Sequence, residues 1–324
     1  MRICIYGAGA VGGYLGVQLS LAGEEVSLIS RGPHLEAMRE SGIKLNTEGK
    51  TRVAHPFCTS NPADIGPQDY VIITLKAPSI PGIVDSIQPL LGPDTAVVTA
   101  YNGIPFWYFY GLEGSWCNQR LESIDSGGEQ WDKIGPERAI GCVVYPATEI
   151  LKPGLIGHID GDRFSLGEPI GGKTNRVSRL SEIMNRAGLR APVRAQIRNE
   201  IWVKLWGNLC FNPISVLTLS TLDIIATEPG TRKVARTMML EAQAIGKRLG
   251  VRFGVDVDRR IAGAAAVGAH KTSMLQDLER GRHMEIDALL TVVQEMGRLV
   301  EVKTPTTDVV LSLVQQRARA SGLY

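Results

Sequence analysis

The stretch KLWGNLCFNP, residues 204–213, places three polar side chains among leucines and aromatic residues. Lys204, Asn208 and Asn212 follow one another at intervals of four residues. Four residues of an α-helix turn through roughly 400°, so these side chains would form one slowly drifting stripe. An ammonium can protonate a developing alkoxide, and amides can orient a polar substrate beside it. The spacing therefore predicts a polar stripe along one helix face, although a lysine by itself is more often a solvated residue of an amphipathic helix. Pro213 predicts that the helix kinks or ends there.

Two further candidate groups lie in the sequence that follows Lys271, which is predicted to be helical. Ser273 to Gln276 fits the Ser-x-x-Gln capping box, which predicts a helix beginning at Ser273 and leaves capping as an alternative role for this serine. Glu285 has Arg282 three residues before it, so a paired surface carboxylate is the alternative for this glutamate. A carboxylate close to Lys204 would oppose the desolvation that lowers the pKa of a buried lysine.

The amino-terminal sequence RICIYGAGAVGG combines a short apolar strand with a glycine-rich turn. Gly7, Gly9 and Gly12 give the spacing GxGxxG directly after the strand and at the start of a helix, inside a βαβ unit of about 30 residues. The first glycine makes the tight turn, the second admits pyrophosphate, and the third lets the helix pack on the strand. We therefore predict a dinucleotide site formed by Gly7, Ala8, Gly9, Ala10, Val11 and Gly12. A purely structural turn is the alternative.

The end of the second strand indicates which dinucleotide is bound. NAD enzymes usually carry Asp or Glu there, whereas this chain has Ser30 and Arg31, and Glu36 lies too far into the next helix. An arginine beside a hydroxyl suits a 2′-phosphate, so Arg31 predicts NADPH/NADP, with a solvent-facing arginine as the alternative. Lys76 and Asn102 end the next two strands and are predicted to contact the cofactor, Asn102 also the substrate.

Alternating apolar strands and helices predict a Rossmann-type, doubly wound α/β domain, and the later sequence is nearly all helical. We therefore predict an NADP-binding Rossmann-like domain over residues 1–195 and a helical substrate and catalytic domain over residues 196–324. The expected elements include strands at 70–76 and 95–103, a helix at 80–91, and continuous helical sequence over 273–300.

Composition excludes several classes of function. The chain of 324 residues has a formal net charge of +2 and no basic block, so we expect no nucleic-acid partner. No apolar stretch approaches the roughly 20 residues of a membrane helix. Five scattered cysteines indicate free thiols in a reducing cytoplasm, and the absence of His/Cys clusters predicts no metal site. The expected partner is a small molecule, with the chain a monomer or homodimer.

The combination of motifs resembles the ketopantoate reductase (2-dehydropantoate 2-reductase) family over essentially the whole chain. It rests on GAGAVGG with the following arginine, on TLK and YNG, and most specifically on KLWGNLCFNP and SMLQDLERGRHMEID. The resemblance implies NADPH-dependent reduction of a 2-oxo acid to a 2-hydroxy acid, by default 2-dehydropantoate to pantoate in pantothenate and coenzyme A biosynthesis.

The resemblance also implies roles for individual residues. Lys204 matches the catalytic lysine, which acts as general acid, and Glu285 matches its acidic partner. The substrate contacts are implied for Asn102, Asn208, Asn212 and Ser273, and the cofactor contacts for the glycine turn, Arg31, Lys76 and Asn102.

The chain departs from the family pattern at three places. Leu222 and His270 stand where further pocket asparagines are expected, and the aromatic residues Phe106–Tyr110 resemble an insertion beside the nicotinamide pocket. An added aromatic wall would favour a bulkier 2-oxo acid or would cover a dimer interface. The alternatives are therefore a paralogous NADP-dependent hydroxy-acid or opine-type dehydrogenase, and a non-catalytic NADP-binding sensor.

Overall fold

A sheet of seven strands, parallel except for one edge strand, forms the centre of the first half of the chain. The computed structural model describes residues 1–324, which divide into two units. The first contains Met1–Tyr101, Phe106–Arg120 and Gly127–Ile197, and the second contains Asn102–Pro105, Leu121–Ser126 and Arg198–Tyr324. Two short segments of the amino-terminal half thus pack with the carboxy-terminal helices, which no sequence pattern indicated.

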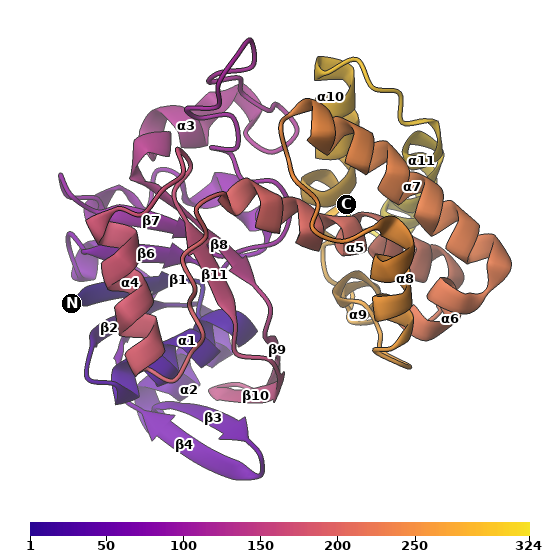
Figure 1. The fold of residues 1–324 in the computed structure, drawn as a ribbon. Coiled ribbons are helices and arrows are strands. Elements are labelled where there is room, and N and C mark those ends of the chain that lie inside the picture. Colours follow the sequence, from indigo (N-terminus) through magenta and orange to yellow (C-terminus); the bar gives the residue numbers. More distant parts are fainter. The chain divides into compact units, whose positions relative to one another are not determined.

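The strand order of this sheet is β11-β8-β7-β6-β1-β2-β5 (Figure 1). Every neighbouring pair is parallel except β11 with β8, and the strands are apolar and buried on both faces, as expected of a covered parallel sheet. The predicted Rossmann-type fold is confirmed. The strands are β1 Arg2–Tyr6, β2 Glu25–Ile29, β5 Phe57–Thr59, β6 Tyr70–Ile73, β7 Ala96–Thr99, β8 Ala139–Val144 and β11 Phe164–Gly167.

A second sheet of four strands was not predicted. Its order is β4-β3-β10-β9, with β3 Ile43–Thr47, β4 Lys50–Ala54, β9 Ala147–Lys152 and β10 Leu155–Asp160. The β3–β4 turn has positive φ at both Glu48 and Gly49, the backbone of a tight hairpin. The dipeptide Glu48-Gly49 between two alternating segments was therefore the sequence signal for this hairpin.

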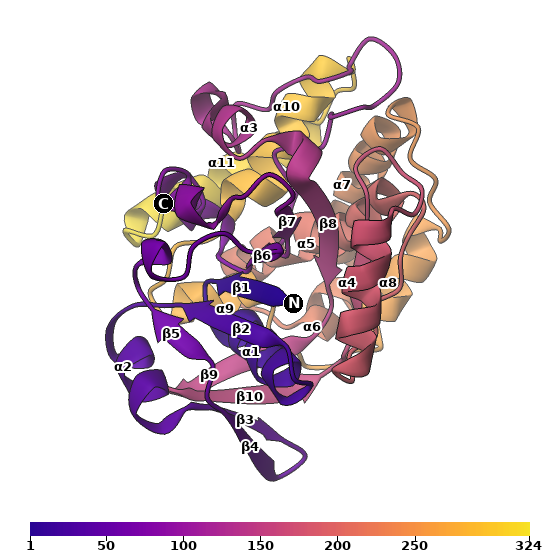
Figure 2. The ribbon, with the colours of Figure 1, turned by 90° about the vertical axis from the view of Figure 1, so that its left-hand side faces the viewer.

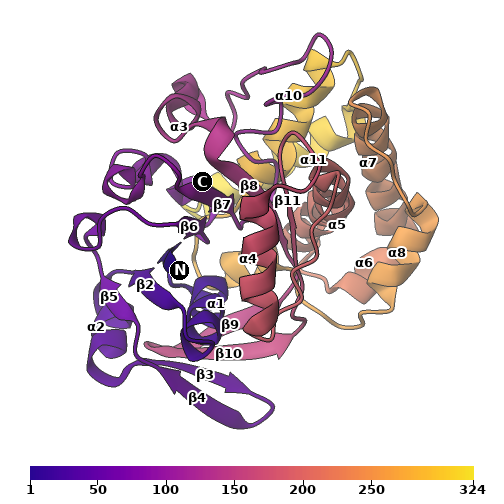
Figure 3. The ribbon, with the colours of Figure 1, turned by 60° about the vertical axis from the view of Figure 1, so that its left-hand side comes forward.

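Helix α1 (Ala10–Leu21) packs between the two sheets (Figure 2). A Cβ at Gly13 would lie 2.7 Å from Ile156 of the second sheet, and one at Gly16 would lie 2.7 Å from Leu28 of the first. Glycines on both sides let the helix approach both sheets, so part of the glycine-rich motif serves packing. Two further helices, α2 (Gly32–Ser41) and α4 (Asn175–Arg186), complete the layers, with α4 packed on β11 (Figure 3). The short α3 spans Glu129–Lys133.

The predicted helix over residues 80–91 was wrong. This segment forms 3₁₀ turns at Ala77–Ser79, Pro81–Ile83 and Gln88–Leu90. Pro81 and Pro89 remove backbone donors, and each restricts the residue before it, so a continuous α-helix cannot form. Strands β6 and β7 are also shorter than predicted. After β6 ends at Ile73, Leu75 packs against Gly7.

The aromatic residues Phe106–Tyr110 are mainly core. Trp107, Tyr108 and Phe109 have no exposed surface, and the Trp107 indole donates a 3.0 Å hydrogen bond to Oγ1 of Thr99. A Cβ at Gly141 of β8 would lie 2.9 Å from the Trp107 ring. The expectation that this segment forms a substrate wall or covers a dimer interface is therefore wrong for these three rings, because they fill the interior.

The second unit is helical, with α5 as its longest helix. Buried apolar side chains surround most of α5, and Trp206 stacks on Phe253 at 4.3 Å between ring centroids. None of the chain's helices is both long and apolar enough to cross a membrane. The helices are α5 Ile197–Thr218, α6 Leu222–Thr227, α7 Pro229–Arg248, α8 Val257–Ala265, α9 Ser273–Glu279, α10 Val292–Leu299 and α11 Pro305–Ala320, shown in orange and yellow tones in Figure 1.

Two helix boundaries differ from prediction. Pro213 does not end α5, which continues to Thr218 with Ile214 and Val216 buried. The predicted continuous helical sequence over 273–300 is interrupted after Glu279, where Gly281 adopts a φ of +60°. A single π-helical turn (Asp287–Thr291) then precedes α10. Glu285 therefore lies just outside a helix, and not on the same helix as Ser273.

We expect Trp107→Ala to lower the free energy of unfolding by about 3–5 kcal/mol, because it leaves a large cavity and removes the partner of Thr99. Denaturant unfolding measures this loss. The control is Phe57→Ala, since Phe57 is 54% exposed and should change stability by less than about 0.5 kcal/mol. Equal effects of the two variants would contradict the core role of Trp107.

Candidate functional site

The glycine turn is held between the ends of β2 and β6. The backbone N–H groups of Gly7 and Ala8 donate to the Ile29 carbonyl at 3.1 and 2.9 Å. On the other side, the Thr74 hydroxyl donates to the Gly7 carbonyl at 2.6 Å, and Leu75 packs against Gly7. Thr74 was not predicted, although its place directly after an apolar strand was a usable signal. These contacts fix the turn before any ligand binds.

The three glycines of the motif have different physical roles. Gly7 has a φ of +105°, and a Cβ at Gly12 would lie 2.2 Å from the Gly7 carbonyl oxygen, so both are required by the turn itself. Gly9 has an ordinary φ of −73°, and a Cβ there would meet nothing within 4 Å. Gly9 therefore faces open space, where a ligand can approach the backbone. Ala10 and Val11 are half-buried beside it, and Ala8 is buried.

The electrostatics of this turn suit an anion. Helix α1 begins after Gly9 without a side-chain cap and without an acidic residue in its first turn, so its amino end keeps free donors. Arg31 follows the end of β2 and is exposed, and Lys76 follows the end of β6 and is half-buried. Because β2 and β6 both hold the turn, the two cations flank it. Pyrophosphate at Gly9 and a 2′-phosphate at Arg31 fit this arrangement.

His34, near the start of α2, was not predicted. Its Nδ1 accepts a 3.1 Å hydrogen bond from the Gly154 N–H, which connects α2 to the β9–β10 turn. Its Nε2 is buried without a hydrogen-bond partner. Burial lowers the pKa of His34, and the nearby Ala8 backbone opposes this shift more weakly. An acceptor at Nδ1 requires the neutral imidazole.

The polar stripe of α5 forms as predicted. Lys204 and Asn208 are half-buried, and Asn212 is only 4% exposed. Nδ2 of Asn212 is buried without a hydrogen-bond partner, which is costly for an amide unless something else completes the bond. An unsatisfied donor on the same stripe as an ammonium is an arrangement that suits a polar ligand.

Asn102 and Glu285 meet within the helical unit. Nδ2 of Asn102 donates to Oε2 of Glu285 at 3.1 Å, although 183 residues separate them. Glu285 is 6% exposed, so the alternative of a surface carboxylate is wrong. Gly103, with a φ of +92°, permits this contact, because a Cβ there would lie 2.2 Å from the Ala288 carbonyl oxygen.

Ser273 is not the cap of α9. Thr272 is the N-cap residue, and its hydroxyl accepts from the Leu275 N–H at 3.2 Å. The buried Thr272 hydroxyl also contacts the Ser215 hydroxyl at 2.6 Å, and Ser215 donates to the Asn212 carbonyl at 2.7 Å. This chain of bonds ties the start of α9 to α5 next to Asn212, and it leaves the Ser273 side chain exposed. Ser215 and Thr272 are positioning residues that the sequence alone did not single out.

The two departures from the family pattern are neighbours. The backbone N–H of Leu222 donates to the His270 carbonyl at 3.0 Å, which joins the start of α6 to the segment before α9. The Leu222 side chain is half-buried and His270 is exposed. Both positions therefore lie near the start of α9, next to Thr272 and Ser273 in the chain or through this bond.

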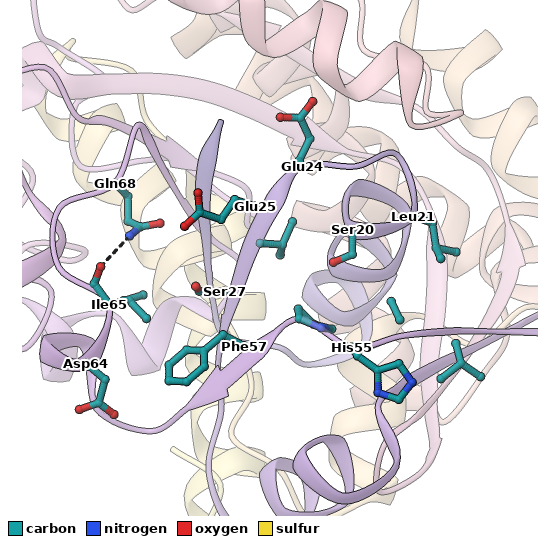
Figure 4. Close-up of a pocket in the computed structure, with 14 residues that line it drawn as sticks. Ser20, Leu21, Glu24, Glu25, Ser27, His55, Phe57, Asp64, Ile65 and Gln68 are labelled. Atoms are coloured by element: carbon teal, nitrogen blue, oxygen red, sulfur yellow. Dashed lines mark hydrogen bonds between the residues drawn. The ribbon is translucent and has the colours of Figure 1, made fainter.

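A surface cavity of about 700 Å³ lies elsewhere in the first unit, lined by the end of α1, the start of β2 and strand β5 (Figure 4). Glu25, Phe57 and Gln68 are among its lining residues. It lies at the amino end of β2, whereas Arg31 follows the carboxyl end, and ligands of doubly wound sheets bind at carboxyl ends. The cavity contains none of the predicted site residues.

Both halves of the chain match family models. Residues 3–106 match the model "Ketopantoate reductase PanE/ApbA", and residues 196–318 match "Ketopantoate reductase PanE/ApbA C terminal". The chain belongs to the ketopantoate reductase family. A relative from Mesorhizobium japonicum, named 2-dehydropantoate 2-reductase, is 57% identical over 325 aligned positions and 100% of both chains.

Solved members of the ketopantoate reductase family share the fold. A ketopantoate reductase-like protein from Ralstonia solanacearum is 42% identical, with a TM-score of 0.95 over 100% of this chain and 99% of its own. A 2-dehydropantoate 2-reductase from Geobacter metallireducens is 27% identical, with a TM-score of 0.85 over 98% of this chain and 99% of its own. The predicted family resemblance and the two-part fold are confirmed.

We expect Gly9→Ala to fold with wild-type stability, within about 0.5 kcal/mol, but to bind NADPH more weakly, because its methyl group projects into the open space of the turn. Gly12→Ala should lose about 2 kcal/mol or more of unfolding free energy, because its Cβ clashes with the Gly7 carbonyl. Denaturant unfolding and NADPH fluorescence titration separate the two effects. Normal NADPH affinity in a folded Gly9→Ala variant would contradict the assignment.

We expect the stabilising contribution of His34 to be lost on acidification. Its native pKa lies below the unfolded value of about 6.5, so the contribution is complete above that pH and declines as the pH falls through it. His34→Ala removes the acceptor for Gly154 and does not titrate. The stability gap between wild type and variant, about 1 kcal/mol at pH 7.5, should therefore narrow by pH 5. A gap independent of pH would contradict this role.

Proposed function

We propose that this ketopantoate reductase family member reduces 2-dehydropantoate to pantoate with NADPH, with Lys204 as general acid. The observation that carries the proposal is the stripe of α5, where the buried, unpartnered amide of Asn212 shares one helix face with Lys204. The relative from M. japonicum bears the name of this reaction, and it supports 2-dehydropantoate as the substrate.

The first unit would hold the cofactor. The backbone from Gly7 to Gly12 would bind the pyrophosphate at the amino end of α1, Arg31 would bind the 2′-phosphate, and Lys76 would contribute a second positive charge. NADPH supplies a hydride to the carbonyl carbon when it is bound. Asn102 belongs to the helical unit and donates to Glu285. In our proposal it therefore orients Glu285, and we do not assign it the predicted cofactor contact.

The helical unit would supply the proton. As hydride adds to carbon, the carbonyl π electrons move to oxygen, and Nζ of Lys204 transfers a proton to that oxygen. Lys204 becomes neutral and regains its proton from solvent. Glu285 favours the charged ammonium and is itself oriented by the Asn102 amide. The net change is addition of one hydride and one proton across the carbonyl.

Neutral donors would orient the substrate. Asn208, Asn212 and Ser273 carry amide and hydroxyl groups that can bind the carboxylate and hydroxyl of 2-dehydropantoate without competing with Lys204 for charge. The Ser215–Thr272 contact fixes Ser273 relative to Asn212. Leu222 and His270 would adjust the preference among 2-oxo acids. We further propose a cytoplasmic monomer or homodimer, in which the first unit binds the cofactor and the helical unit, including Asn102–Pro105 and Leu121–Ser126, binds the substrate.

The decisive experiment is a panel of 2-oxo acids assayed with NADPH and NADH in parallel. We expect 2-dehydropantoate with NADPH to be the preferred combination, and Lys204→Ala to lower its kcat by about 10²–10⁴-fold while NADPH affinity stays unchanged. Ser312→Ala on the exposed face of α11 serves as the control. Wild-type turnover in Lys204→Ala would refute the general-acid role, and amine-dependent NADPH consumption would instead indicate an opine-type reaction.

A further inference from the structure

The residues on either side of Glu285 are held by the segment that follows α11. The backbone N–H of Met284 donates to the Leu323 carbonyl at 3.3 Å. Two residues beyond Glu285, Oδ1 of Asp287 accepts a 2.9 Å hydrogen bond from the Tyr324 hydroxyl. Leu323 and Tyr324 thus contact the chain on both sides of Glu285, an arrangement that we call the bracket.

This bracket is itself anchored to α11. Gly322 adopts a φ of +67° after the helix, and the Leu323 N–H returns to the Ala318 carbonyl at 2.9 Å. Leu323 is 8% exposed. The Tyr324 hydroxyl also accepts from Nε2 of Gln315 at 2.9 Å, and the Arg319 guanidinium lies 5.1 Å from the centre of the Tyr324 ring. The tyrosine is therefore held at both its ring and its hydroxyl.

Asp287 connects the bracket to the loop that carries Asn102. It begins the π-helical turn, in which the Val292 N–H donates to the carbonyl of Asp287, five residues back. Its Oδ1 also accepts from the Thr291 hydroxyl at 2.6 Å. In the same turn, the Ala288 carbonyl accepts from the Ile104 N–H at 3.2 Å. The π-helical turn therefore contacts both Tyr324, through Asp287, and Ile104, through the Ala288 carbonyl. Single π-helical turns commonly occur at functional sites.

We propose that Tyr324 is a positioning residue for Glu285, which it holds against Asn102 through its hydrogen bond to Asp287. The inference rests on the proposed function, in which Glu285 assists Lys204. Without the tyrosine hydroxyl, Asp287 loses its link to α11, and the segment from Met284 to Ala288 gains freedom. The carboxylate of Glu285 then spends less time in the geometry set by the 3.1 Å bond from Asn102.

The test is Tyr324→Phe, which removes only the hydroxyl. We expect kcat with 2-dehydropantoate to fall roughly five-fold, with a smaller change in KM and none in NADPH affinity or melting temperature. Asp287→Ala should lose at least as much, because it also removes the acceptor of the Thr291 hydroxyl. The double variant should lose little more than Asp287→Ala, because the tyrosine contact is already absent there. Asp287→Asn keeps an oxygen acceptor for the tyrosine and should retain near-wild-type kcat.

Ser312→Ala is the matched control, since it removes an exposed hydroxyl from α11 that bonds only within the helix, to the Asp308 carbonyl. Unchanged kcat in Tyr324→Phe, or fully additive losses in the double variant, would overturn the proposal while leaving the proposed function intact. A parallel fall in kcat, NADPH affinity and melting temperature would also overturn it, because that pattern indicates a general structural role.

Hydrogen exchange separates this proposal from failure of the proposed function. The amide of Met284 should exchange about five-fold faster in Tyr324→Phe than in wild type, whatever substrate the enzyme accepts. If wild-type protein reduced no 2-oxo acid but this exchange increased, the bracket would stand and the proposed function would fall. Unchanged exchange would overturn the bracket whether or not the enzyme is active.

Discussion

The close approach between Gly12 and the Gly7 carbonyl is the constraint on which the first unit depends. No side chain fits there, since a Cβ at Gly12 would lie 2.2 Å from that oxygen. The approach lets α1 start directly over the ends of β1, β2 and β6 and then run between the two sheets. Gly13 and Gly16 continue the same close packing further along the helix. A turn that suits pyrophosphate is thus also the point at which the layers of the fold are joined.

The helical unit depends on a different kind of constraint, which is the satisfaction of buried polar groups. Ser215 and Thr272 satisfy each other, and Asn102 satisfies Glu285. Buried polar groups without partners are costly, so each of these contacts fixes the elements that carry it. The Asn212 amide is left unsatisfied in the same region. We interpret this contrast as a site in which the protein supports the surrounding groups and leaves one donor for a substrate.

Much of the fold could be predicted because strong local patterns specify it. The strand–turn–helix at Gly7, the buried strands and the long helix α5 each follow from hydrophobic periodicity or from glycine spacing. Prediction from local patterns failed where a helical hydrophobic pattern contains proline. Prolines at 81 and 89 replaced a predicted helix by 3₁₀ turns, while Pro213 was tolerated inside α5. The difference lies in tertiary packing, because buried neighbours on both sides of Pro213 hold the helix together.

The sequence by itself determined the family, the glycine-rich strand–turn–helix at Gly7 and the stripe from Lys204 to Asn212, because each of these depends on residues close together in the chain. Only the tertiary structure decided that Glu285 is buried against Asn102, that Thr272 and not Ser273 caps α9, and that the aromatic residues 107–109 are core. It also revealed the contact of His34 with the β9–β10 turn and of Tyr324 with Asp287. These contacts join residues separated by tens to hundreds of positions, and no local spacing records which distant partner a side chain will meet.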